Sequence, residues 1–174
     1  MAGAIYYRDV HGYALRGGNM KALCLYYSRT NTTRVIMKRM AMLLDADLVE
    51  YTDGVDRSGF KGYIRSCIDS FKKPPQVHLT QAVDWDAYDT VIVAMPIWSE
   101  MPSAVGKGIL EQYGSNFKGG VYLVVTHMAG IDYDKAIRKI YRLCANEPKG
   151  HLSLQTKNHD PDMEIKRFVG SIKG

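Results

Sequence analysis

One stretch near the start of the sequence limits the fold more than any other. An apolar run from Ala22 to Tyr27 changes abruptly into residues 28–33, which read SRTNTT. The run is too short for a membrane span and too rich in large apolar residues for a loop, so it predicts a strand buried on both faces. From Thr32, apolar residues recur at spacings of mostly three and four as far as Asp45, which predicts a helix. We therefore expect a buried strand, a polar loop and a helix in succession.

The polar loop, residues 28–33, suits an anion. Backbone N–H groups without intrahelical partners and the positive end of the helix dipole meet at a helix start, so a phosphate group can bind there without a metal. The alternative is an ordinary capped helix, since Ser, Thr and Asn are the preferred N-cap residues. A cap needs one hydroxyl, whereas this loop holds four hydroxyls and an amide. We favour anion binding.

Strands and helices alternate along the rest of the chain. Further strands are predicted at 48–51, 90–94, 121–125 and 152–154, and helices at about 59–72, 103–112, 134–144 and from 160 onward. The large apolar residues of the 59–72 helix recur at three and four, which we interpret as core packing and not as a surface for a ligand. The alternation predicts one α/β domain with a parallel sheet covered on both faces. Ligands of such sheets lie beyond the carboxyl ends of the strands.

Three loops are expected to meet at that edge. They are the polar loop, a loop of residues 96–102 with a proline near each end and Trp98 inside it, and residues 126–132. A tryptophan offers a flat face for a planar ring, and stacking contributes about 0.5 to 1.5 kcal/mol beyond area burial. We favour this ligand role for Trp98 over a place in the core. A phosphate site beside a stacking surface predicts a mononucleotide with a planar head group.

Motif absences and composition argue against several other classes. The sequence has no G-x-x-x-x-G-K-[ST] motif and no G-x-G-x-x-G after a strand, which argues against a P-loop NTPase and a dinucleotide-binding fingerprint. The formal net charge is +5, but basic residues are spread along the chain, so no nucleic-acid partner is indicated. The three cysteines include no C-x-x-C pair and are interpreted as reduced and structural.

The location and limits of the domain follow from the same features. The sequence has no apolar stretch of transmembrane length and no secretion-signal layout, so we expect a cytoplasmic protein with no membrane partner and no metal. Residues 1–19 show no sustained period and end just before Met20. We interpret them as a leader from expression, or as an extension upstream of a natural start. Residues 20–174 form the expected domain.

The polar motifs resemble those of a known family. The S-x-T-N-x-T arrangement of residues 28–33 matches the phosphate loop of flavodoxins, and residues 96–102 look like the loop that flanks the flavin in flavodoxin-like proteins. The resemblance covers essentially residues 20–172. It implies a short-chain flavodoxin-like protein with FMN as cofactor. The implied fold is a three-layer, doubly wound α/β structure with five parallel strands in the order 2-1-3-4-5.

The resemblance also implies which residues bind the cofactor. The polar loop would hold the FMN phosphate, Trp98 would stack on the ring with its neighbours at the polar edge, and residues 126–130 would line the other side. The implied cofactor-binding residues are Ser28, Arg29, Thr30, Asn31, Thr32, Thr33, Pro96, Ile97, Trp98, Ser99, Thr126, His127, Met128 and Gly130. For the aromatic expected on the second face of the ring, Tyr133 is the nearest candidate.

Three functions remain open at this point. The favoured one is an FMN-binding electron-transfer protein that passes one or two electrons between redox partner proteins, whose surfaces a basic protein would attract if acidic. The second is an FMN-dependent reductase that moves electrons from NAD(P)H to a quinone or similar acceptor. The third is a flavin-free interaction module of the same fold. A homodimer is left open.

Overall fold

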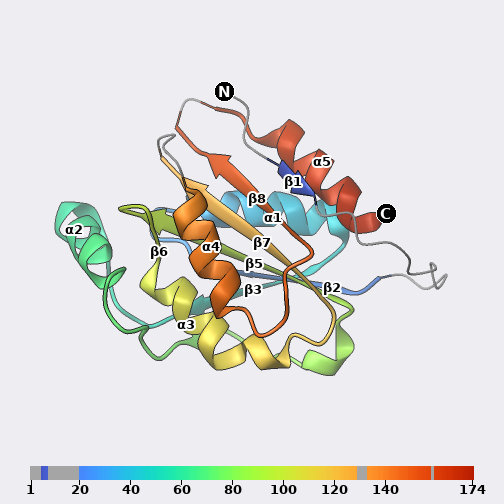
Figure 1. The fold of residues 1–174 in the computed structure, drawn as a ribbon, viewed down its shortest axis with the longest axis horizontal. Coiled ribbons are helices and arrows are strands. Elements are labelled where there is room, and N and C mark those ends of the chain that lie inside the picture. The colour runs from blue at the N-terminus through green and yellow to red at the C-terminus, as the bar shows by residue number, and fades with distance from the viewer. Residues whose placement is uncertain (1–4, 8–19, 129–132, 158) are drawn as a thin grey trace.

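The computed structural model describes residues 5–7, 20–128, 133–157 and 159–174. A sheet with helices on both faces forms the molecule (Figure 1). The parallel strands are β2 (Ala22–Tyr26), β3 (Asp47–Thr52), β5 (Thr90–Trp98), β7 (Gly120–His127) and β8 (Gly150–Gln155). Across the sheet they lie in the order β3, β2, β5, β7, β8. The α/β class and the flavodoxin-like layering expected from the sequence are confirmed.

Three short antiparallel strands were not expected. They are β1 (Ile5–Tyr7), which pairs with β8, β4 (His78–Leu79), which pairs with β3, and β6 (Met101–Pro102), which pairs with β5. The sheet of the described residues therefore has eight strands and not five. Segments of two or three residues are too short to show the period of two that marks a strand. The division of the chain at residue 20 stays a prediction.

Five α-helices lie among the described residues. They are α1 (Thr32–Leu44), α2 (Gly59–Asp69), α3 (Ala104–Tyr113), α4 (Asp134–Leu143) and α5 (Asp162–Lys173), with 3-10 turns η1 (Trp85–Ala87) and η2 (Gly114–Asn116). Helices α1 and α5 pack on one face of the sheet, whereas α3 and α4 pack on the other (Figure 1). None of these helices is long and apolar enough to cross a bilayer.

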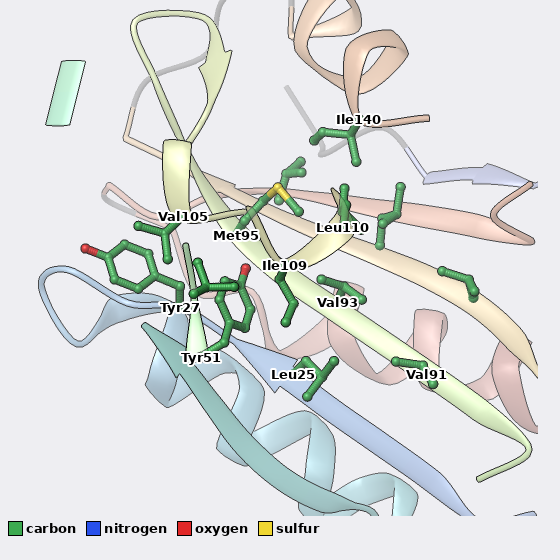
Figure 2. Packing of buried hydrophobic residues seen from close by; sticks show 14 of the residues in the cluster. Leu25, Tyr27, Tyr51, Val91, Val93, Met95, Val105, Ile109, Leu110 and Ile140 are labelled. Carbon is green, nitrogen blue, oxygen red and sulfur yellow. The ribbon is translucent and has the colours of Figure 1, made fainter. Parts of the chain in front are cut away.

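The core forms because successive residues of a strand face opposite sides of the sheet. Every residue of β2 and of β5 is buried, as expected of strands covered on both faces. Figure 2 shows the α3 side of the sheet, where Met95 lies near Ile109 and Leu110. Tyr51 is fully buried there, and its hydroxyl donates a 2.8 Å hydrogen bond to the Ala94 carbonyl. Burial raises the pKa of Tyr51 well above its ordinary value.

Residues 96–102 do not form the expected loop. Strand β5 continues through Trp98 and turns back into β6, and the turn residues Ser99 and Glu100 both have positive φ, at 49° and 61°. Two such residues are typical of the tight turns that connect antiparallel strands. Pro96 is tolerated because β2 ends opposite Ala94, so its carbonyls no longer line that side of β5. The Pro96 carbonyl instead accepts a 3.0 Å bond from the Ser103 N–H.

The interpretation of the 59–72 helix as core packing was wrong. The helix ends at Asp69, and its largest apolar side chains are exposed to 40% or more instead of buried in the core. The exposed set, together with one residue just beyond the helix, is Phe60, Tyr63, Ile64, Ile68 and Phe71. Periodicity identifies a face of a helix, but it does not say which face the rest of the fold covers.

Candidate functional site

A cavity of about 340 Å³ opens where β2, β5 and β7 end. Its lining is drawn from the polar loop, the β5–β6 hairpin, the end of β7, α2, and the segments before α4 and after β8. The lining residues are Arg29, Thr30, Thr32, Thr33, Tyr63, Pro96, Ile97, Trp98, Ser99, Glu100, Thr126, His127, Met128, Tyr133 and Thr156. This is the carboxyl edge of the parallel strands, where the loops of such sheets meet.

The polar loop enters α1 without a side-chain cap. Asn31 stands at the N-cap position with φ 68° and ψ −8°, and no side-chain cap bond forms there. Asparagine tolerates this left-handed conformation better than most residues. The Thr33 hydroxyl instead lies 2.9 Å from that of Thr126, which joins the start of α1 to the end of β7. The loop hydroxyls are therefore not used as an ordinary helix cap, in agreement with an anion site.

Ser28 supplies a second sign that something polar belongs here. Its hydroxyl oxygen is buried, yet it has no hydrogen-bond partner among the described residues. Leaving a buried polar group unsatisfied costs about 1–3 kcal/mol. Ser28 and Asn31 do not line the cavity, although they flank residues that do. A ligand oxygen at the polar loop would give the Ser28 hydroxyl the partner it lacks.

Aromatic side chains form several walls of the cavity. Trp98 is only 7% exposed and packs edge-on against Tyr27, with ring centroids 5.9 Å apart. The sequence posed a choice between a ligand role and a core role, and the structure shows that Trp98 belongs to the core while also lining the cavity. Elsewhere in the lining, the Tyr133 ring stacks on the His127 ring, with ring centroids 3.9 Å apart. The His127 Nε2 atom lies 3.0 Å from the Ser153 hydroxyl, which fixes the ring.

Few charged side chains line the cavity. Arg29 lines it, lies 5.5 Å from the centre of the Tyr63 ring and donates to the Arg57 carbonyl at 3.4 Å. Arg34, the other arginine near the loop, pairs instead with Glu50 at 2.7 Å. One carboxylate, Glu100, also belongs to the lining. Among the described residues that line the cavity, Arg29 is the one arginine, and none is a lysine.

No protein-family model and no curated protein matches the sequence. Among solved structures, the chain is similar to a flavoprotein from Lactobacillus acidophilus NCFM in complex with FMN, with 23% identity, coverage of 85% of this chain and 97% of that one, and a TM-score of 0.62. A protein from Bacteroides eggerthii assigned as a flavoprotein matches with 17% identity, 88% and 98% coverage and a TM-score of 0.66. Oxidised flavodoxin 1 from Bacillus cereus matches with 12% identity, coverage of 88% of this chain and 97% of that one, and a TM-score of 0.53. The chain has the flavodoxin fold.

Most of the residues proposed from the sequence come together at the carboxyl edge of this flavodoxin fold. The members of the proposed set that line one cavity are Arg29, Thr30, Thr32, Thr33, Pro96, Ile97, Trp98, Ser99, Thr126, His127 and Met128. Ser28 and Asn31 lie next to it along the chain. Gly130 falls outside the described residues and stays a prediction.

Sequence reasoning missed three contributors to the cavity. Tyr63 was assigned to a core-facing stripe, and Glu100 was not selected because nothing distinguished it from a surface carboxylate. Thr156 follows β8, so it could have been found by applying the carboxyl-edge rule to the last strand as well as to the earlier ones. Tyr133, named only as the nearest second aromatic, does line the cavity.

Proposed function

We propose that this chain binds FMN in the cavity and carries electrons between protein partners. The observation that carries the proposal is the combination, in one cavity, of an uncapped hydroxyl-rich helix start and an aromatic wall at Trp98. Helix starts of this kind are ready-made phosphate sites. Further support comes from the structural neighbour that is described as an FMN complex.

Each part of the site has a role in this proposal. The N–H groups at the start of α1, the Ser28, Thr30 and Thr32 hydroxyls and the Arg29 guanidinium would hold the phosphate. Trp98 would contact the ring, with Tyr133 as the second aromatic, and the backbone of Pro96, Ile97 and Ser99 would meet its polar edge. The Thr33 hydroxyl, bonded to Thr126, ties the helix start to β7 and so holds the loop in place.

The chain's own residues do the binding and shielding, whereas the cofactor supplies the redox chemistry. When bound, the isoalloxazine ring of FMN accepts and returns one or two electrons. Trp98 and Tyr133 exclude water from the ring by covering apolar surface, and the buried Trp98–Tyr27 contact keeps the tryptophan from moving. Arg29 offsets the charge of the phosphate.

The test compares FMN with riboflavin, which has no phosphate. The purified chain is mixed with either flavin, desalted and examined by visible absorption, and the Kd of each is obtained by titration. Thr30→Ala with Thr32→Ala should weaken FMN binding at least tenfold and riboflavin binding much less, since hydrogen bonds to a charged group contribute about 1.5–3 kcal/mol. Thr80→Ala, at an exposed threonine outside the cavity lining, is the matched control.

The two tryptophans supply the second comparison. Trp98→Leu should weaken both flavins, whereas Trp85→Leu, which alters a half-buried tryptophan outside the cavity lining, should leave both affinities unchanged. No retained flavin at micromolar protein would refute the cofactor assignment and favour a flavin-free module. If the flavin-loaded protein oxidises NAD(P)H with a quinone over multiple turnovers, it is a reductase and the electron-carrier proposal is wrong.

A further inference from the structure

Helix α2 presents an apolar stripe to solvent. Phe60, Ile64 and Ile68 lie on its outer face and Phe71 continues the stripe beyond the helix, with exposures of 76%, 44%, 52% and 65%. Figure 1 shows α2 at the edge of the molecule, apart from the two helix layers. Contiguous exposed apolar patches on a folded protein mark interaction sites.

The helix is inverted with respect to an ordinary surface helix. Its buried residues are the small ones, Gly62 and Ser66, and Ser70 follows them on the same side. A Cβ atom at Gly62 would lie 2.1 Å from the backbone of Arg57, so this face lies close against the segment that leads into the helix. A surface helix normally buries its large apolar residues and exposes polar ones. The outward position of the stripe is therefore built into the packing of α2.

Buried charged groups hold the segment that leads into α2 and the C-terminal end of the helix. Before the helix, the Arg57 guanidinium donates two 2.7 Å bonds to Asp53 and one of 3.2 Å to Asp69. At the other end, the Lys107 ammonium of α3 donates to the carbonyls of Ser70 and Lys72 at 2.9 and 2.8 Å. Arg57 and Lys107 are each only 4% exposed. Such buried charged groups fix the position of α2 instead of leaving it loosely attached.

Positive charge surrounds the stripe. The flanking cations are Lys61, Arg65, Lys72 and Lys73, all exposed. The one acidic residue of the helix, Asp69, is already engaged by Arg57, and it also lies 3.2 Å from Lys72 and 3.6 Å from Arg65, which leaves Lys61 and Lys73 as flanking cations without an ion pair to it. A second copy of this chain would bring the same cations against these, and like charges across an interface are unfavourable. A partner surface that complements the stripe and its cations has an apolar centre and an acidic rim.

The stripe also adjoins the cavity. Tyr63, on the same helix, lines it, and Arg29 of the polar loop lies over the Tyr63 ring. We propose that α2 is the docking surface for an acidic electron-transfer protein, which binds the Phe60–Phe71 stripe with its apolar centre and the flanking lysines and Arg65 with its carboxylates. The redox role of this partner rests on the proposed function, because a protein seated on α2 lies beside the proposed flavin site. An anionic lipid surface would meet the same charges, so binding to lipid vesicles is a separate outcome of the test.

The test uses a plant-type [2Fe–2S] ferredoxin, an acidic electron carrier, as the probe. Its Kd for the full chain is measured by calorimetry at low ionic strength, with and without FMN. Lys61→Glu with Arg65→Glu should raise the Kd at least tenfold, and Ile64→Ser with Ile68→Ser should do the same. The matched controls on α1 are Lys38→Glu, at an exposed cation, and Met42→Ser, at a 70% exposed apolar residue, and each should change the Kd less than twofold.

The outcomes separate docking from cofactor binding. Added salt should weaken the native complex more than that of the Lys61→Glu, Arg65→Glu variant. Ferredoxin binding through α2 by a chain that retains no FMN supports the docking surface and refutes the proposed function. The docking proposal is overturned if the native chain does not bind ferredoxin, or if both α2 variants bind it as tightly as the native chain. It is equally overturned if the stripe instead mediates binding to phosphatidylserine vesicles, or a dimer that Ile64→Ser with Ile68→Ser dissociates.

Discussion

Helices α1 and α2 follow two neighbouring, paired strands, yet they use their apolar side chains in opposite ways. Helix α1 buries Ile36, Met37 and Met40 against the sheet. Helix α2 exposes its isoleucines and packs through Gly62 and Ser66. Both sequences show apolar residues at spacings of three and four. The same pattern therefore marks a core face in one helix and a free face in the other.

The difference lies in what each helix offers on the side opposite its apolar stripe. Glycine and serine on α2 permit a close approach to the backbone that leads into the helix, and contacts from Arg57 and Lys107 fix its C-terminal end. The opposite side of α1 carries long side chains such as Lys38 and Met42, which are exposed. A row of small residues opposite a large apolar stripe is thus the sequence feature that would have corrected the interpretation of α2.

The largest expected loss of stability comes from removing Arg57, the buried cation that contacts α2. Arg57→Ala removes the partner of Asp53, whose side chain is only 2% exposed, and we expect a loss of about 3–5 kcal/mol because the carboxylate stays buried without its cation. The free energy of unfolding in urea measures the loss. Arg65→Ala is the matched control, since Arg65 is 58% exposed and lies 3.6 Å from Asp69; it should cost less than about 1 kcal/mol. Equal losses in the two variants would show that α2 is not held by Arg57.

The pH dependence of the same variant provides an internal check. Burial raises the pKa of Asp53, but hydrogen bonds from Arg57 and from the Val55 N–H outweigh it and lower that pKa below its ordinary value. Stability from this carboxylate is thus present above about pH 3.9 and lost as the pH falls through the lowered pKa. Without Arg57, only backbone N–H bonds such as that of Val55 still oppose burial, so the pKa of Asp53 rises relative to the native protein and the variant loses less stability at low pH. The stability difference between native and variant proteins should therefore shrink as the pH falls below about 4.

The same substitution, isoleucine to alanine, can be made on the buried face of α1 and on the exposed face of α2. Ile36 of α1 is 5% exposed, so Ile36→Ala should cost about 2–5 kcal/mol from lost burial and the cavity left behind. Ile68 of α2 is 52% exposed, so Ile68→Ala should change the free energy of unfolding by no more than about 0.5 kcal/mol. Urea titrations of both variants give the comparison directly. A large loss at Ile68 would mean that the stripe is covered by the chain itself.

Much of the fold could be predicted because its main signals are local. The runs at β2 and β5 are apolar throughout, and α1 begins and ends within one residue of the expected limits. The extension of β5 through Trp98 could not be predicted, because a proline commonly ends a strand and only the early end of β2 makes Pro96 acceptable. That end is a property of the sheet and not of the segment around Pro96.

The residues of the candidate site also fall into those that the local sequence predicts and those that it does not. The polar loop and Trp98 were found because they follow strands, and the topology of a parallel sheet brings such segments together. Tyr63 was missed because it reaches the cavity from α2, whose inverted orientation depends on Arg57 and Lys107, residues with no motif around them. Contacts set by the local chain are visible in a sequence. Contacts set by a distant anchor are visible only in the structure.

The smallest expected effect comes from two helical glycines that test the close approach of α2. Gly62→Ala places a Cβ atom 2.1 Å from the Arg57 backbone, so the helix must shift, and we expect a loss of about 1–3 kcal/mol. Gly170→Ala on α5 meets nothing within 4 Å and should stabilise the protein by about 0.4–1 kcal/mol, because alanine restricts the unfolded chain. Thermal unfolding of both variants measures the contrast. If Gly62→Ala also stabilises, α2 does not pack through its small residues, and the outward position of its apolar stripe loses its physical cause.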